Sequence, residues 1–158
     1  MDRYKQAFTE VLDVDDDDLI RLASACPSLR SFKLPCAEMA GGDATFKAFC
    51  QHCPALNRLE IFAGIGCLSA TGSWFNELRE NPAWAPKLKK LTISEQDKDK
   101  YKDAMLAMSK ERKDLLIMFV RCDDMGSYRG RSDFEVFMDQ KYKGGKKVKC
   151  KEFHREKL

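Results

Sequence analysis

The sequence lacks any run of about 20 apolar residues, the length that a membrane-spanning helix needs. It also lacks an apolar signal core after its first residues, Met1 to Lys5, so we expect no secretory signal and no membrane partner. Histidine is limited to His52 and His154, and no serine stands in a nucleophile-elbow motif. Catalysis has few groups to use, so we expect a binding protein, with no cofactor and no metal, rather than an enzyme.

The chain of 158 residues is long enough for one domain with a buried core, and its apolar and charged fractions are 44% and 34%. The seven cysteines are an odd number and accompany no signal peptide. We therefore expect reduced thiols in a cytoplasmic or nuclear protein. These cysteines are Cys26, Cys36, Cys50, Cys53, Cys67, Cys122 and Cys150.

The net charge of +3 conceals an uneven distribution of charge. Residues 141–158 hold eight Lys or Arg and two Glu, a local charge of +6, whereas the rest of the chain carries more acidic than basic side chains. We interpret residues 139–158 as a basic C-terminal tail that could contact nucleic-acid phosphates or an acidic partner. Tyr142 and Phe153 could stack on bases, but two aromatic residues favour a solvated terminal strand over a nucleic-acid site.

A repeated unit is visible in the first half of the chain. Its two copies, residues 19–34 and 46–61, match at an offset of 27, and both contain a Cys-Pro pair, at Cys26 and at Cys53. A third copy follows at an offset of 32, with Pro86, Leu88, Leu91 and Ile93. A fourth follows at a further 27, without the proline, with Leu115, Met118 and Val120.

Each unit predicts a helix, a turn and a short strand. The proline ends the helix, and the strand alternates, with Leu59 and Ile61 inward and Arg58 and Glu60 outward. Strand, return helix and parallel strand predict an α/β leucine-rich-repeat solenoid of about four repeats, a right-handed β-α superhelix of the ribonuclease-inhibitor type. The alternative is a generic α/β sandwich whose spacing agrees by chance, but seven anchors at one offset favour the solenoid.

We place the solenoid at residues 15–138, after an N-terminal lead-in or partial repeat at residues 1–14. The carboxylates of Asp15 to Asp18 suit a helix start, and we expect Asp43 or Thr45 to cap the second helix and Ser73 the third. One continuous apolar seam is expected from the anchors Leu22, Leu29, Phe32, Leu34, Phe49, Leu56, Leu59, Ile61, Leu88, Leu91 and Ile93.

The Cys-Pro-x-Leu-x-x-Phe/Leu-x-Leu/Ile units resemble the cysteine-containing leucine-rich repeats of F-box proteins. A second resemblance, to the C-terminal repeats of fungal F-box/leucine-rich-repeat proteins, spans residues 15–145 and includes Ala44-Thr45-Phe46, residues 72–91, Glu135-Val136-Phe137 and residues 142–145. The resemblance implies the substrate-binding repeats of a cullin-type ubiquitin-ligase receptor. In that family an F-box binds the Skp adaptor, so a Skp-type partner is expected only if an F-box lies upstream of Met1, because none precedes the first repeat.

Three further motifs suggest ion or phosphate sites and have simpler interpretations. Cys50 and Cys53 have zinc-ligand spacing, but Cys53 is already a repeat anchor, so we expect buried thiols. The segment from Asp13 to Asp18 begins like a calcium loop but lacks its glycine and final glutamate, so we expect a capped helix start. Gly64-Ile65-Gly66 is not followed by the Lys-Ser/Thr of a phosphate loop.

The binding site is expected on the concave face, where strand side chains point away from the apolar seam. Both charge signs are present there, which suits a protein partner, of unknown identity, better than nucleic acid. No strand precedes the first helix in register, so we expect either upstream repeats or self-association through the N-terminal edge. The predicted partner-binding residues are Ser31, Lys33, Arg58, Glu60, Lys90, Thr92 and Arg121.

Overall fold

The computed structural model describes residues 14–37, 42–63, 73–94, 102–128, 131–149 and 156–157. In this part of the chain helix and strand alternate four times and three more strands follow, so the protein is α/β, as the sequence predicted. The elements are α2 (Asp16–Ala25), β1 (Ser31–Ala37), α3 (Asp43–His52), β2 (Arg58–Ala63), α4 (Ser73–Glu80), β3 (Lys90–Ser94), α5 (Lys102–Glu111), β4 (Leu116–Tyr128), β5 (Arg131–Lys143), β6 (Lys146–Lys147) and β7 (Glu156–Lys157).

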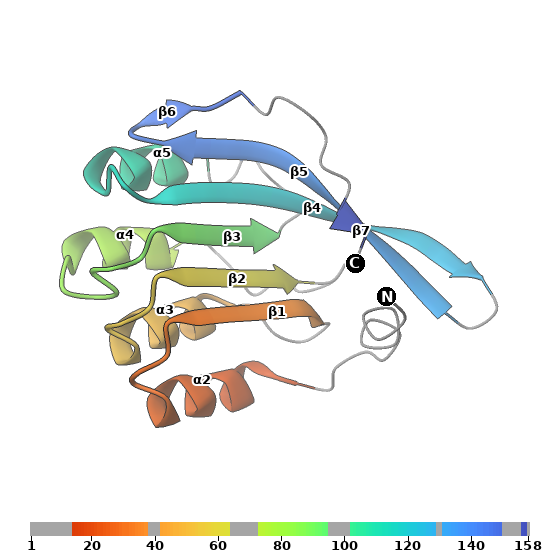
Figure 1. Cartoon of the computed structure of the whole chain (residues 1–158), viewed down its shortest axis with the longest axis horizontal. Helices are drawn as coiled ribbons and strands as arrows, with labels where there is room; N and C mark the ends of the chain where they lie inside the picture. Colours follow the sequence, from red (N-terminus) through yellow and green to blue (C-terminus); the bar gives the residue numbers. More distant parts are fainter. Residues whose placement is uncertain are drawn as a thin grey trace.

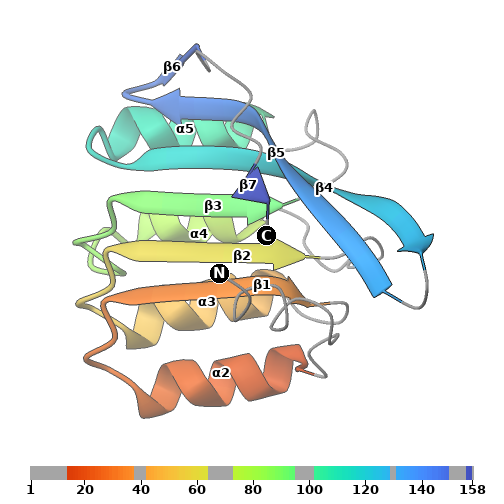
Figure 2. The same cartoon turned by 45° about the vertical axis from the view of Figure 1, so that its right-hand side comes forward.

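One mixed sheet holds all of these strands. Its first six strands lie in sequence order, and β7 pairs with β5. The pairs from β1 to β4 are parallel, whereas β5 runs antiparallel to β4 and to β6. The helices lie on one face of the sheet, with α2 beside the edge strand β1, and the other face is turned toward the viewer (Figure 1, Figure 2).

The parallel strands pair in the register that the sequence repeat predicts for the first three units. Phe32 lies beside Leu59, and Leu59 lies beside Leu91, so each anchor meets its equivalent in the next copy of the repeat. Parallel neighbours need a crossover connection, and α3, α4 and α5 each provide one. The spacing of the sequence repeat therefore equals the length of chain between one strand and the next.

The fourth unit departs from the predicted register. Leu91 pairs with Ile117 and Ile93 with Phe119, at an offset of 26, whereas the sequence repeat predicted Met118 and Val120 at these positions, so the predicted offset of 27 was wrong. The reason lies just before the strands. In the third unit Lys89 stands between the turn that ends at Leu88 and the strand that begins at Lys90, and the amides of Lys89 and Lys90 share the carbonyl of Asn57. In the fourth unit the turn ends at Leu115, and the next residue, Leu116, already pairs with Lys90. The fourth unit therefore lacks one residue between turn and strand, and its side chains alternate in the opposite phase.

Strands β4 and β5 differ from the short strands that the sequence suggested. Each is 13 residues long, and together they form an antiparallel hairpin. The predicted boundary between the repeats and the basic tail, at residue 138, falls inside β5. The first part of the predicted tail is therefore a strand of the sheet.

The first helix starts as the sequence predicted, and the second does not. The Asp15 carboxylate accepts a hydrogen bond of 2.9 Å from the Asp18 amide, and the two residues form a reciprocal capping box. The second helix has Gly42 at its N-cap and no side-chain cap, so the caps proposed from Asp43 and Thr45 were wrong. Because both side chains bond to neighbouring helices, they are not used as caps.

Polar side chains join each helix to the next. The Asp16 carboxylate accepts hydrogen bonds from the Thr45 hydroxyl and the Gly42 amide, which tie α2 to α3. The Ser73 hydroxyl, proposed as a cap, donates instead to Asp43 across α3 and α4, at 3.1 Å. Arg79 and Glu111 form an ion pair between α4 and α5. Each helix is therefore joined to the next by at least one polar contact.

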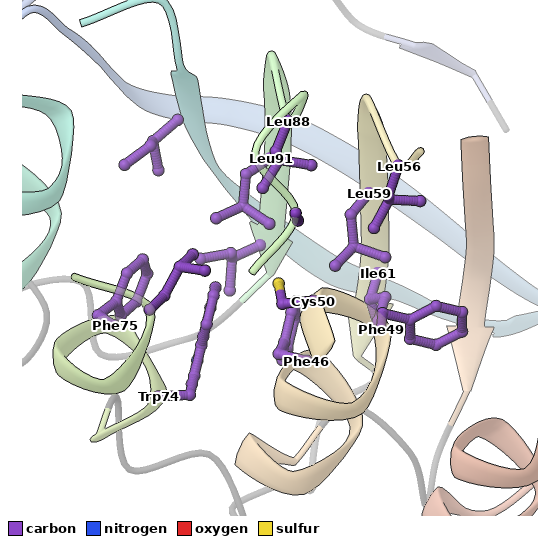
Figure 3. Close-up of a cluster of buried hydrophobic side chains, with 14 of the residues drawn as sticks. Phe46, Phe49, Cys50, Leu56, Leu59, Ile61, Trp74, Phe75, Leu88 and Leu91 are labelled. Atoms are coloured by element: carbon purple, nitrogen blue, oxygen red, sulfur yellow. The ribbon is translucent and has the colours of Figure 1, made fainter. Parts of the chain in front are cut away.

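The core lies between the helices and the sheet. Aromatic rings stack through it, with Phe46 and Trp74 4.6 Å apart and Trp74 and Phe75 4.1 Å apart between ring centroids (Figure 3). Apart from three residues of the first unit, every predicted seam residue is buried. The confirmed residues are Leu34, Phe49, Leu56, Leu59, Ile61, Leu88, Leu91 and Ile93.

The three exceptions lie at the β1 edge of the sheet. Leu22 is 38% exposed, so its predicted burial was wrong, and Leu29 and Phe32 are only partly buried. Phe49, one unit on from Leu22, is fully buried, because the ring of Phe32 stacks on it at 4.5 Å. Within the described residues no strand stands before α2 to cover Leu22 in the same way.

The turns between helix and strand also repeat, although their side chains differ. In each turn an amide donates to the carbonyl three residues earlier, at Cys26, Cys53, Ala85 and Arg112. The Cys53 thiol contacts the carbonyl oxygens of Ala23 and Cys26 at 3.5 Å. Arg112, at the equivalent position, donates to the carbonyls of Leu78, Asn81, Trp84 and Ala85. A thiol and a guanidinium therefore satisfy carbonyls of the preceding unit from the same position.

Candidate functional site

The face of the sheet opposite the helices carries two rows of paired residues. Cross-strand partners place their side chains on the same face, and these positions alternate with the buried residues of the core. The first row is Ser31, Arg58, Lys90 and Leu116, and the second is Lys33, Glu60, Thr92, Met118 and Lys141. Six of the seven predicted partner-binding residues therefore lie together on one face.

Glu60 is the centre of a hydrogen-bonded cluster on this face. One of its carboxylate oxygens accepts from Arg58 Nε at 2.7 Å, and the other accepts from Thr92 Oγ1 at 3.0 Å and lies 3.1 Å from Lys90 Nζ. Glu60 is 4% exposed and Thr92 is 1% exposed. Both oxygens of this buried carboxylate already have partners within the protein. Glu60 is therefore not available to bind a ligand.

The electrostatics of the cluster favour the charged form of Glu60. Burial alone would raise the pKa of the Glu60 carboxyl. Hydrogen bonds from Lys90 and Thr92, the charge of Lys90 and the hydrogen bond from Arg58 outweigh that effect, so the pKa lies below its usual value of 4.5. Glu60 is therefore ionised at neutral pH, and its charge holds the two cations in place.

The charged side chains that reach solvent from the paired positions of β1, β2 and β3 are cationic. The Arg58 side chain is 47% exposed and that of Lys90 30%, and Lys33 and Ser31 are also exposed. The sequence predicted a face of mixed charge, but Glu60, the one carboxylate at the paired positions of the two rows, is buried beneath the cations. The exposed charge on the described part of the face is positive.

The predicted basic tail continues this face. Tyr142 pairs with Ile117 and is fully buried, so the suggestion that it could stack on bases was wrong. Its two neighbours, Lys141 and Lys143, point to the opposite side of β5, the side of Arg58 and Lys90. Lys146 of β6 pairs with Lys143 and shares that side. Lys143 and Lys146 are exposed and Lys141 is half-buried, so the two regions form one cationic face.

Sequence reasoning missed Lys141, Lys143 and Met118 as members of this face. The alternation of lysines around Tyr142 was a period-two signal that could have identified a strand with one buried side. Met118 was missed because the fourth unit was assigned the wrong phase. Arg121, the seventh predicted residue, pairs with Phe137 in the β4–β5 ladder, and its side chain lies outside the described residues.

Cys50 and Cys53, which lie outside this face, are buried thiols, as the sequence predicted. Burial raises the pKa of the Cys50 thiol to about 12, against a smaller opposing effect of Arg112. Burial and then the nearby Cys26 raise the pKa of Cys53. A high pKa keeps a thiol protonated and unreactive at neutral pH. In the described part of the chain, no three His, Cys, Asp or Glu side chains lie where they could hold a metal ion.

None of the described helices has both the length and the hydropathy needed to cross a membrane. Comparisons of the chain with protein-family models, with curated protein sequences and with solved structures gave no match.

Proposed function

We propose that this chain is a leucine-rich-repeat solenoid that recognises a protein partner on the sheet face opposite its helices. The observation that carries the proposal is the cationic face itself, formed by outward side chains at equivalent positions of successive parallel strands. Repeat proteins of this architecture bind ligands along such a stacked surface, because successive units present equivalent side chains in register.

The resemblance to F-box receptors extends the proposal to a role in ubiquitin ligation, with this chain holding the substrate. In that role the repeats bind the target, and a Skp-type adaptor takes part only through an F-box encoded upstream. We also propose an intracellular location, in the cytosol or nucleus, supported by the odd number of cysteines and by the free thiols of Cys26, Cys50 and Cys53.

Site-specific photo-crosslinking tests the proposed face. A benzophenone amino acid at Ser31, an exposed position on the face, is compared with one at Gln51, an exposed position on α3. We expect a discrete crosslinked protein from position 31, identified by mass spectrometry, which disappears when Arg58→Glu and Lys90→Glu are added. Crosslinking from position 51 alone, or from position 31 with no response to the charge reversals, would show that the face is not the binding site.

A second candidate function is nucleic-acid binding, favoured by the continuity of Lys141, Lys143 and Lys146 with Arg58 and Lys90. Binding of this kind releases counterions, so its affinity falls steeply as salt is raised. Titration of a labelled single-stranded RNA and a duplex DNA, at low and at physiological salt, tests this candidate. Affinity that persists at physiological salt and is lost in Lys141→Glu/Lys143→Glu would support it, and affinity confined to low salt would exclude it.

A further inference from the structure

We propose that the ligand of this face is an acidic protein segment in which apolar residues stand between carboxylates. This inference rests on the proposed function and specifies the chemistry of the partner. It follows from three features of the described residues: the sign of the exposed charge on the face, the side chains between its two cationic groups, and the burial of Tyr142 on the opposite side of β5.

All of the exposed charged side chains that the structure describes on this face are positive. Six cations lie on the face, and the single carboxylate among the paired positions of its two rows, that of Glu60, is buried and occupied by three donors. A partner bearing carboxylates therefore gains attraction along the face without meeting an exposed like charge. The six cations are Lys33, Arg58, Lys90, Lys141, Lys143 and Lys146.

An apolar strip separates the cations into two groups. Leu116 and Met118 of β4 lie between Arg58 and Lys90 on one side and Lys141 on the other, and both are half-buried. Apolar side chains on a solvent-facing sheet surface gain free energy when a partner covers them. The arrangement, with apolar residues at the centre and charged residues around them, is that of a protein–protein interface.

The spacing of the strands sets the spacing of the ligand's carboxylates. Neighbouring strands lie about 4.8 Å apart, so β3 and β5 are separated by about 10 Å, and β2 and β5 by about 14 Å. An extended peptide covers about 3.3 Å per residue. Carboxylates about three to four residues apart, with apolar residues between them, therefore reach both cationic groups while the apolar residues cover β4.

The same features favour a protein segment over nucleic acid. Sheets that bind single strands place aromatic rings on the face, where bases stack on them. Here Tyr142 points into the core, and Leu116 and Met118 occupy the centre of the described face.

Fluorescence anisotropy with the intact chain tests the inference. The probe is a short fluorescein-labelled peptide with the core Glu-Glu-Leu-Leu-Glu-Glu, and its comparison peptides replace every Glu by Gln or both Leu by Ser. We expect binding of the acidic peptide at physiological salt, loss of binding with the Gln peptide, and weaker binding with the Ser peptide. The two comparisons separate the contribution of charge from that of the apolar strip.

Paired charge reversals locate the binding. The affinity for the acidic peptide should fall by about tenfold or more in each of two double variants, Arg58→Glu/Lys90→Glu and Lys141→Glu/Lys143→Glu. Arg21→Glu/Lys102→Glu makes the same charge change at exposed residues of the helices and should leave affinity unchanged. Circular dichroism of each variant establishes that it is folded. If the first pair unfolds the chain, Arg58→Gln with Lys90→Gln replaces it.

Three outcomes would overturn the inference: no binding of the acidic peptide, equal binding of its Gln version, or tighter binding of an oligouridylate of similar length. The last outcome would assign the face to nucleic acid. If the peptide fails while the crosslink from position 31 remains, the partner is a protein of other chemistry, and only the acidic ligand is excluded. If the crosslink also fails, the proposed function is excluded with it.

Discussion

The guanidinium of Arg112 donates a 2.8 Å hydrogen bond to the carbonyl oxygen of Trp84, from the turn position that Cys53 occupies two units earlier. Arg112 also donates to three further carbonyls in and after α4. Helix ends leave carbonyls without partners in the helix, and a buried carbonyl without a partner is costly. One cation therefore closes the end of α4 and orders the turn that leads to β3.

Replacing Arg112 by Lys should destabilise the protein strongly. A lysine ammonium cannot reach four carbonyls as the forked guanidinium does, so we expect a loss of about 3 kcal/mol in the free energy of unfolding. Urea denaturation followed by circular dichroism measures it. Arg79→Lys, at an arginine paired with Glu111 on the helix surface, is the control and should change little. Equal midpoints for the two variants would show that the Arg112 network does not stabilise the fold.

Shortening Leu59 to Ala should destabilise the protein by roughly 2–5 kcal/mol, because its side chain is fully buried between β1 and β3 and a cavity would remain. Leu22→Ala is the matched control at a side chain that is 38% exposed, and a smaller loss is expected there. Chemical denaturation of both variants makes the comparison. A Leu59→Ala midpoint equal to that of the wild type would contradict the strand register.

The Glu60 cluster should make stability depend on pH. The folded-state pKa of Glu60 lies below the usual 4.5, so the unfolded chain binds the proton more tightly. The stabilisation is therefore complete above about pH 4.5 and is lost as pH falls through the lower, folded-state pKa. In urea denaturation at successive pH values, Glu60→Gln should show a weaker pH dependence than the wild type. Glu80→Gln, at an exposed carboxylate on α4, should retain the wild-type slope.

The two glycines between β5 and β6 should respond differently to alanine. Both have positive φ, 61° at Gly144 and 76° at Gly145, so alanine at either site should cost about 1 kcal/mol. A Cβ at Gly145 would also lie 3.0 Å from the Cβ of Lys110, and the Gly145 amide bonds to Ser109 Oγ, whereas Gly144 has open space. In thermal denaturation the Tm of Gly145→Ala should therefore be lower than that of Gly144→Ala. The reverse order would contradict the packing of this turn on α5.

The β1 edge should support self-association of the chain. It exposes Leu22 and leaves Phe32 half-buried, whereas Phe49, which occupies the position of Leu22 in the next unit, is covered by Phe32. We expect the mass from light scattering to rise above 18.1 kDa as concentration increases, and Leu22→Glu to reduce the effect. The exposed Ser24→Glu change, on the same helix, is the control. A mass of one chain at every concentration would exclude association through this edge.

For the cationic face, the sequence specified which residues of the first three strands point outward, because side chains in a strand alternate with a period of two. It did not specify their environment. Glu60 was expected as an exposed charge. It is buried because Arg58, on its own strand, and Lys90, on the neighbouring strand, both form ion pairs with it. Burial of a charge depends on partners that include residues distant along the chain, and alternation carries no information about them.

The sequence by itself determined the repeating unit: the offset between its first copies, the inward residues of β1 to β3, and the capped start of α2 all follow from short-range periodicity and local hydrogen bonding. Only the tertiary structure decided what happens at the two ends of the sheet. Leu22 is exposed because no strand stands before α2 in the described chain, although its place in the repeat equals that of Phe49. At the other end, β5 pairs antiparallel with β4, which buries Tyr142 and turns its flanking lysines onto the face of Arg58. Which distant segments pair depends on the free energy of each alternative pairing. The pairing that forms is the one that buries the most apolar surface and satisfies the hydrogen bonds of the backbone.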